Sequence, residues 1–303
     1  MNNCPLTQLP EQIGELSQLQ TLSLAGTQLK TLPASIGKLT RLRHLNASFS
    51  RLESLPAQIG QLKNLSELEL VGNSIKTLPD QLAGLTKLQS LNMTGNGLEA
   101  LPTRIGELKS LKALSIGDNA LTELPAGIGQ LKDLSRLNVF SNKLGSLPEQ
   151  IGELGKLAHL DAEGNSLTAL PESIGKLSSL SVLKLGANRL SAVPNSLEGL
   201  ASLQKLDLNN NQLLSLPEGV GKLKSLKLLN LSGNQLTSLP EGMSELSNLV
   251  ALDAWGNKIT RMPSQLGKLH KLEHFVFQPD WLSSGQLRLL REQLSGTLVP
   301  VRF

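Results

Sequence analysis

The chain has 303 residues, of which 39% are hydrophobic and only 2% aromatic, and it carries a formal net charge of +4. Aromatic side chains normally supply much of the area buried in a globular core, so a core made almost wholly of Leu indicates one small unit copied many times. The single Cys4 excludes a disulfide framework and a Cys-rich metal site, and no apolar run is long enough to predict a membrane span. The modest charge gives little support to a nucleic-acid partner.

Twelve prolines define a repeat. They follow one another at intervals of 23 residues from Pro10 to Pro263, and each unit reads LPxxIGxLxxLxxLxLxxNxLxx. We expect three parts: a partial repeat at residues 1–9, twelve full repeats at 10–285 and a C-terminal segment at 286–303. Because no unit of this size can bury its own Leu face, each is expected to be held by its neighbours.

The partial repeat at residues 1–9 has no clear N-terminal cap. Cys4 stands at the position that Asn occupies in later repeats, so the chain opens in mid-repeat, with Leu6 and Leu9 in the next apolar positions. Solenoids need a polar end. We therefore expect either that this chain is a piece of a longer protein or that its N-terminal edge associates with another molecule, including a second copy. The first residues show neither a basic start nor an apolar segment, so we expect no secretory signal.

Each full repeat predicts one short strand. Leu114 and Ile116 lie two residues apart and point to one face, whereas Ala113 and Ser115 point to the other. Stacked in parallel, such strands make a curved sheet with its apolar face inward. The LPxxIGxL segment returns over the outside, and its Pro and its Gly, such as Gly106, favour a tight bend. We expect a short turn or a single helical turn there.

A column of Asn residues follows the strands. Asn occupies the ninth motif position in the third to eleventh repeats, from Asn73 to Asn257, while Thr27 and Ser50 replace it in the first two. A side-chain amide at this point can satisfy backbone groups that become free where the chain leaves the strand. We interpret the column as a structural ladder, weaker in the first two repeats, rather than as a binding row.

The last repeat is degenerate, with Asp280 at the Asn position. After it, Leu residues at 287, 289, 290 and 294 have the spacing of an amphipathic helix. That helix would cover the last repeat, so we expect residues 286–303 to form a helical cap and a tail.

The pattern LPxxIGxLxxLxxLxLxxNxL resembles the 23-residue class of intracellular leucine-rich repeats, over essentially residues 5–285. That class occurs in Ras-pathway and cell-polarity scaffolds, in plant intracellular repeat proteins and in bacterial effectors. The resemblance implies an α/β fold: a curved horseshoe solenoid with a parallel sheet on its concave face and short turns or helical turns on its convex face. It also implies a non-enzymatic scaffold that binds a protein partner on the concave face, without a cofactor. The alternative is the substrate-recognition domain of a bacterial effector, for example a ubiquitin ligase, whose catalytic domain lies outside this chain.

Partner choice is expected to rest on the third, fifth and seventh motif positions, which the repeat leaves open on the inner sheet. Phe140 and Trp255 are large apolar residues in a seventh column of otherwise small or polar residues, and exposed aromatics are favoured interface anchors. The other interpretation is that each ring folds down over a neighbouring repeat. We expect two partner-binding patches. The first comprises Arg136, Asn138, Phe140, His159, Asp161 and Glu163, and the second comprises Leu228, Asn230, Asp253 and Trp255.

No set of residues predicts catalysis or a metal site. His159 and Asp161 share one strand face, which suggests a general base, but no nucleophile stands beside them. The His residues of the third column lie five repeats apart, too far to share an ion at a strand spacing of about 4.8 Å. The inner columns hold more acidic than basic residues, the opposite of a nucleic-acid groove. We therefore expect no enzymatic activity, no metal and no nucleic-acid partner.

Three Asn-x-Ser/Thr sequons, at Asn46, Asn92 and Asn230, fall on inner strands, where glycans would block the sheet face. Together with the single cysteine they favour a reducing cytoplasm. If the chain is a delivered effector, that compartment is the cytoplasm of a host cell.

Overall fold

The computed structural model describes residues 4–295, so expectations for residues 1–3 and for the tail at 296–303 lie outside the described residues. The chain divides into two compact units, Met1–Leu144 and Gly145–Phe303. Each unit contains six short strands, one per repeat. Within residues 4–295, no helix has the length and apolar character needed to cross a membrane.

The strands of the first unit are parallel and keep one register. β1 pairs with β2 as Thr21↔His44, and each later pair keeps the same offset of one repeat. The central residue of each strand, such as Leu45, is buried, while the residues on either side of it are exposed or half-buried. The strands are β1 Thr21–Ser23, β2 His44–Asn46, β3 Glu67–Glu69, β4 Ser90–Asn92, β5 Ala113–Ser115 and β6 Arg136–Asn138.

The second unit repeats this arrangement with slightly longer strands near its C-terminal end. β7 pairs with β8 as His159↔Val182, and the register continues through β12. The strands are β7 His159–Asp161, β8 Val182–Lys184, β9 Lys205–Asp207, β10 Leu228–Asn230, β11 Ala251–Ala254 and β12 His274–Phe277. One strand per repeat, parallel to the next, confirms the predicted α/β solenoid class.

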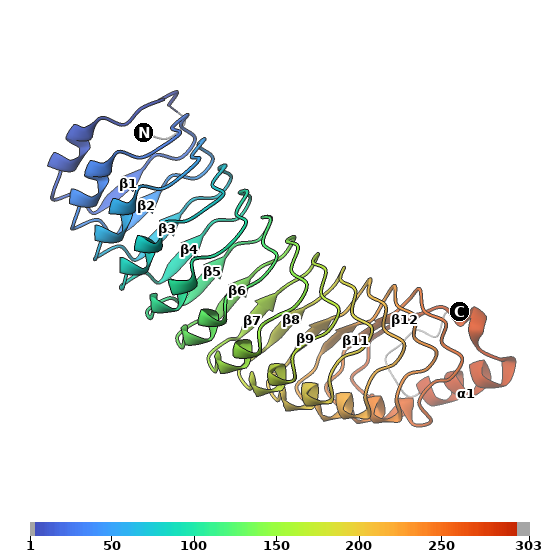
Figure 1. Ribbon diagram of the computed structural model, residues 1–303. Coiled ribbons are helices and arrows are strands. Elements are labelled where there is room, and N and C mark those ends of the chain that lie inside the picture. The colour runs from blue at the N-terminus through green and yellow to red at the C-terminus, as the bar shows by residue number, and fades with distance from the viewer. Residues whose placement is uncertain (1–3, 296–303) are drawn as a thin grey trace. The chain divides into compact units, whose positions relative to one another are not determined.

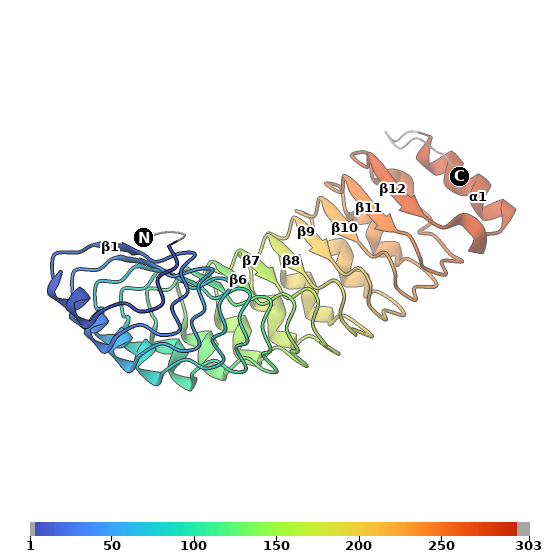
Figure 2. The ribbon, with the colours of Figure 1, turned by 90° about the horizontal axis from the view of Figure 1, so that it is seen from above.

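A 3-10 helix stands opposite each strand, which confirms the predicted helical turn on the return segment. Figures 1 and 2 show, in each unit, the strands on one face and these turns on the other. In most repeats the proline precedes the turn in an extended conformation, as at Pro33 with φ −68° and ψ 154°. The turns are η1 Glu11–Glu15, η2 Ala34–Lys38, η3 Ala57–Gln61, η4 Asp80–Gly84, η5 Thr103–Glu107, η6 Ala126–Gln130, η7 Glu149–Glu153, η8 Glu172–Lys176, η9 Asn195–Gly199, η10 Glu218–Lys222, η11 Glu241–Glu245 and η12 Leu266–Lys268.

The Asn column forms the predicted ladder. Asn211 shows its geometry: its Nδ2 donates to the carbonyl oxygens of Leu185 at 2.9 Å and Leu208 at 3.1 Å, and its Oδ1 accepts the Leu190 N–H at 2.9 Å. Leu185 and Leu190 belong to the preceding repeat, so each amide ties two repeats together. In the first two repeats, hydroxyls replace the amide, and Ser50 Oγ donates to Leu24 O at 3.1 Å. A hydroxyl has a single proton to donate, so the rung has fewer bonds there.

The glycine of the LPxxIG segment has a different role from the predicted one. Its φ is not positive, so it makes no left-handed bend. Instead, a Cβ placed on Gly14 would lie 2.7 Å from the carbonyl oxygen of Ser35, and one on Gly106 would overlap the carbonyl oxygen of Gly127. The absent side chain therefore lets the turns of successive repeats pack backbone to backbone.

The left-handed residues occupy the eighth motif position, directly before the Asn column. They comprise six glycines, for example Gly72 at φ 65°. They also comprise five other residues, namely Phe49, Asp118, Ser141, Ala187 and Asn210. A non-glycine residue in this conformation costs backbone energy, because its Cβ crowds the carbonyl oxygen. Phe49, the bulkiest of the five, is 67% exposed with its ring against Gly72.

A helix follows the last repeat. α1, Ser284–Leu294, begins with a capping box in which Ser283 and Gln286 satisfy each other's backbone N–H groups. Leu290 and Leu294 are buried, and Gln293 Nε2 donates to Ser264 O at 2.7 Å, so the helix covers the last repeat. Before it, η13 Pro279–Trp281 leaves Asp280 exposed and outside the Asn ladder.

The N-terminal edge of the described chain is held by one backbone bond, from the Gln28 N–H to Leu6 O at 2.9 Å. Cys4 is exposed, and Leu16 is among the exposed large hydrophobic residues. Self-association through this edge stays a prediction.

Candidate functional site

The strand face of each unit consists of the outward side chains at the third, fifth and seventh motif positions. Several side chains in the fifth column are fixed by hydrogen bonds to the backbone, which the sequence analysis did not predict. Asn46, Asn138 and Asp207 each accept, through Oδ1, the N–H of the residue two positions later, at 2.9, 3.2 and 3.2 Å. The recurrence of Asn and Asp in this column signals the bond, because both side chains accept from a nearby backbone N–H.

In the first unit, Arg136 and Asn138 lie on β6 and Phe140 follows that strand. The Phe140 ring lies directly over Gly117, and the residue is half-buried. Its ring therefore folds onto the preceding repeat, and Gly117 leaves the room for it. Arg136 is exposed.

The strand face of the first unit also carries polar contacts between β2, β3 and β4. His44 Nδ1 lies 3.0 Å from Glu67 Oε2. Burial raises the pKa of Glu69 above its usual value; a hydrogen bond from Asn92 opposes the shift, and the nearby Glu67 adds to it.

In the second unit, β7 carries His159 and Asp161, and Glu163 follows. Asp161 is buried; its Oδ2 pairs with Lys184 Nζ at 2.8 Å and its Oδ1 accepts the Glu163 N–H at 3.2 Å. One oxygen thus joins β7 to β8, and the other holds the backbone just after β7. Both bonds indicate a structural role for the Asp161 carboxylate. The first predicted patch is divided between the two units, with three residues in each.

The second predicted patch is brought together within the second unit. In the sheet register Leu228 stands opposite Ala251, and Asn230 stands opposite Asp253. Trp255 follows directly after β11, and Asp253 Oδ1 accepts the Trp255 N–H at 2.9 Å. A shallow groove of about 220 Å³ crosses these strands. Its lining comprises Lys205, Leu206, Asp207, Leu228, Leu229, Asn230, Ala251, Leu252, Asp253, His274 and Val276.

The groove exists because Ala251 is small between larger neighbours. Its register partners in the third column are Leu228 on β10 and His274 on β12. Leu228 is 42% exposed, Val276 47% and Trp255 53%. Sequence reasoning missed Val276 and His274 because they lie in the degenerate last repeat. Both residues stand in the third and fifth columns like Leu228 and Asn230, and this position in the motif could have identified them.

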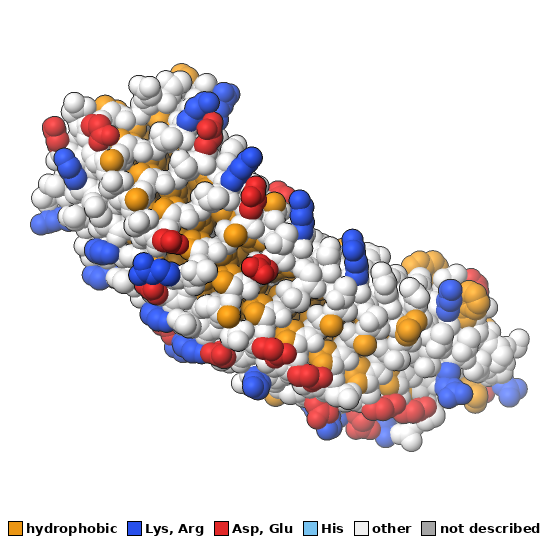
Figure 3. Space-filling view, viewed as in Figure 1, with side chains coloured by type: hydrophobic (Ala, Val, Ile, Leu, Met, Phe, Trp, Pro, Cys, Tyr) orange, Lys and Arg blue, Asp and Glu red, His pale blue; other side chains and the backbone are white. Residues whose placement is uncertain are grey.

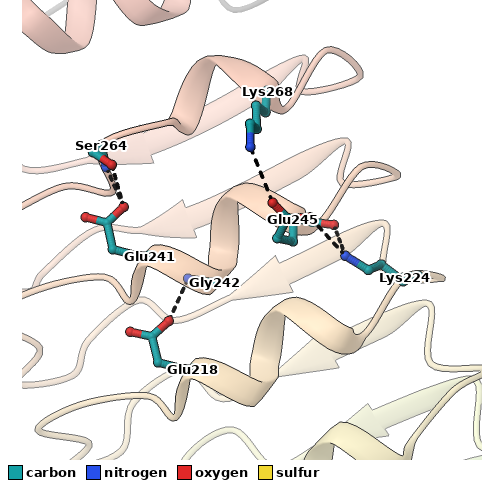
Figure 4. A network of polar contacts seen from close by, with 7 residues as sticks. All are labelled: Glu218, Lys224, Glu241, Gly242, Glu245, Ser264 and Lys268. Carbon is teal, nitrogen blue, oxygen red and sulfur yellow. Dashed lines mark hydrogen bonds and ion pairs between the residues drawn. The ribbon is translucent and has the colours of Figure 1, made fainter.

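The opposite face serves repeat stacking. Figure 3 shows charged side chains along the margin of each unit that carries the 3-10 turns. In Figure 4, Glu245 lies between Lys224 and Lys268, 3.5 Å from each ammonium, and Glu218 accepts the Gly242 N–H of the next turn at 2.7 Å. The two lysines hold the pKa of Glu245 below its usual value. These contacts hold successive repeats together.

Chemically, the described residues offer a surface for binding. Among residues 4–295, no three His, Cys, Asp or Glu side chains are grouped closely enough to hold a metal ion. The groove combines exposed apolar side chains with carboxylates, a composition suited to a protein surface or peptide segment.

Comparisons with known proteins agree with this architecture. Models described as "Leucine-rich repeat region" match residues 1–95 and 36–116, and models described as "Leucine rich repeat" match residues 155–213 and 203–259. No curated protein sequence matches the chain.

Solved structures are similar over nearly the whole chain. A leucine-rich repeat protein of Leptospira interrogans is 33% identical with a TM-score of 0.79, covering 99% of this chain and 82% of its own. A plant peptide hormone receptor, RGFR1 in complex with RGF2, is 27% identical with a TM-score of 0.58, covering 92% of this chain and 54% of its own. An internalin of Listeria monocytogenes, at 23% identity, a TM-score of 0.80, and coverage of 100% of this chain and 85% of its own, shows the fold alone.

The Leptospira similarity extends over most of both chains, and the family matches fall in both units. The chain belongs to the leucine-rich repeat proteins.

Proposed function

We propose that this chain is a non-enzymatic scaffold that binds a protein partner on the strand face of its second unit, the face that a leucine-rich repeat array makes concave. The observation that carries the proposal is the groove over β9–β12, whose lining includes the exposed Leu228 and Val276, with the exposed Trp255 following directly after β11. Monomeric proteins in water rarely expose several large apolar side chains around a groove unless a binding partner covers them.

The leucine-rich repeat is generally a protein-interaction scaffold, and the plant receptor named above is described in complex with RGF2. That complex supports a peptide or protein partner here as well. We also propose that the interaction takes place in a cytoplasm, because the chain has a single cysteine and because three of its sequons lie on strands.

The test uses two leucines of similar exposure. Leu228 lines the groove, whereas Leu214 is 60% exposed and is not part of the groove lining. A photoreactive amino acid at position 228 is expected to cross-link a partner in a lysate, and the same residue at 214 is not. Leu228→Glu is expected to abolish capture, while Leu214→Glu leaves it intact. Equal capture by both variants, with unchanged circular dichroism, would move the site off this face.

A further inference from the structure

The groove is lined by two carboxylates, those of Asp207 and Asp253, and the charge of Asp253 is not paired with a cation among the described residues. Its Oδ1 accepts the Trp255 N–H, and it forms no ion pair with any residue among 4–295. Its register partners in the fifth column are Asn230 and Val276, both uncharged. The carboxylate therefore keeps acceptor capacity for a cation supplied from outside the chain.

Asp207, the other carboxylate of the groove, differs in its surroundings. Its register partner is Lys184, whose pKa is raised chiefly by the hydrogen bond with Asp161 and further by Asp207. Lys205 lies two residues before it on the same strand. Asp207 thus has two lysines near it, whereas the register partners of Asp253 carry no charge.

The surroundings of Asp253 are apolar. The exposed Val276 is its register partner on β12, Leu228 stands on the adjacent strand β10, and Trp255, also exposed, follows it by two residues in the chain. An arginine suits such a place better than a lysine. Its guanidinium is planar, is weakly hydrated, stacks on an indole face and donates to a carboxylate through two parallel N–H bonds.

We propose that the groove selects a partner segment that presents an arginine, whose guanidinium pairs with Asp253 and stacks on Trp255 while a neighbouring apolar side chain fills the space over Ala251. This inference rests on the proposed function, because it names the chemistry that the same groove recognises. The sheet supplies the geometry: β10 and β12 stand about 10 Å apart, wide enough for one side chain between Leu228 and His274.

The experiment uses the full chain on a synthetic peptide array. The central residue of each peptide is Arg, Lys, Glu or Ala, and the flanks are randomised among neutral residues. Asp253→Asn removes the charge but keeps the acceptor, as Asn230 does for the Ser232 N–H at 3.0 Å. Asp118→Asn is the matched control, because it removes one charge from the first unit at a left-handed position that Asn tolerates.

Arg-centred peptides are expected to be retained about tenfold more strongly than Ala-centred ones, by the parent chain and by Asp118→Asn alike. Asp253→Asn is expected to bring that ratio close to one. Trp255→Leu, which keeps apolar area, is expected to remove the preference of Arg over Lys.

Three results would count against the assignment. Equal retention of Arg, Lys and Ala peptides, all lost in Leu228→Glu, overturns the arginine and leaves the proposed function standing. A preference for Glu-centred peptides overturns it as well. Retention that Leu228→Glu does not change overturns both proposals.

Discussion

The ammonium of Lys184 lies 2.8 Å from Oδ2 of the buried Asp161, across the adjacent strands β8 and β7. The pair joins two repeats on the strand face, and Asp161 additionally accepts the Glu163 N–H. Removing the lysine leaves a buried carboxylate with one bond fewer, so Lys184→Met is expected to lower the free energy of unfolding by about 1–2 kcal/mol. Asp161→Asn keeps the backbone acceptor and is expected to cost less.

A double-mutant cycle with these two substitutions, measured by urea denaturation, is expected to show a coupling of about 1 kcal/mol. Additive effects would contradict the pair. The hydrogen bond with Asp161 raises the pKa of Lys184 above its ordinary 10.5. The stability that this pKa shift contributes is therefore fully present below pH 10.5 and is lost as the pH rises through the raised pKa of Lys184.

Ala187→Gly is expected to stabilise the protein by about 1 kcal/mol. Ala187 has φ 52°, a conformation that crowds its Cβ and that glycine adopts without strain. The control is Ala201→Gly, an exposed alanine whose φ is not positive, where glycine only adds freedom to the unfolded chain and is expected to destabilise. Thermal melting distinguishes the two, and a loss of stability in both would show that the left-handed strain is relieved elsewhere.

Gly152 and Gly155 form a matched pair three residues apart. A Cβ on Gly152 would overlap the backbone of Ser173 in the next turn, whereas a Cβ on Gly155 meets nothing within 4 Å. Gly152→Ala is therefore expected to cost about 1–3 kcal/mol by pushing two repeats apart, and Gly155→Ala is expected to be neutral or slightly stabilising. Equal midpoints in denaturant would refute direct packing of the turns. Ala83, Glu198 and Ser244 occupy the same motif position, so the array admits a side chain there where the neighbouring turn adjusts.

Glu69→Gln is expected to stabilise the first unit at neutral pH. Burial raises the pKa of Glu69 above 4.5, so the folded state binds its proton more tightly than the unfolded state does. The cost of holding the charge is present above the raised pKa and disappears below pH 4.5, where both states are protonated. Unfolding curves of parent and variant are thus expected to differ at pH 7 and to converge near pH 4. A constant difference across that range would refute the burial effect.

The repeat made the fold predictable because every apolar position recurs in one register. The strand centred on Leu114, the turn after each proline and the Asn ladder all follow from spacing alone. The LPxxIG glycine was misassigned, because a sequence shows that a side chain is absent but not whether φ or a close contact requires it. The left-handed eighth position stayed hidden for a related reason: Phe49 and Ala187 stand where six other repeats have glycine.

The candidate site was predictable only in part. Leu228, Asn230 and Asp253 share one face because strand alternation determines it, and Trp255 follows directly after β11. The groove depends in addition on Ala251 being small and on Val276 in the degenerate repeat, and these are differences between neighbours rather than features of the motif. The folding of the Phe140 ring over Gly117 likewise depends on which residue the preceding repeat carries.

The ladder of Asn211 and its equivalents has a consequence for how such a chain changes over generations. Each amide bonds only to its own repeat and the one before it, and every strand pairs at the same offset of one repeat. Deleting or duplicating one whole repeat within a unit therefore restores every rung at the junction, whereas a shift by any other length breaks all of them. Recombination between repeats can thus lengthen or shorten the array in complete steps while folding is preserved, and the sequence of the strand face can vary independently of the number of repeats.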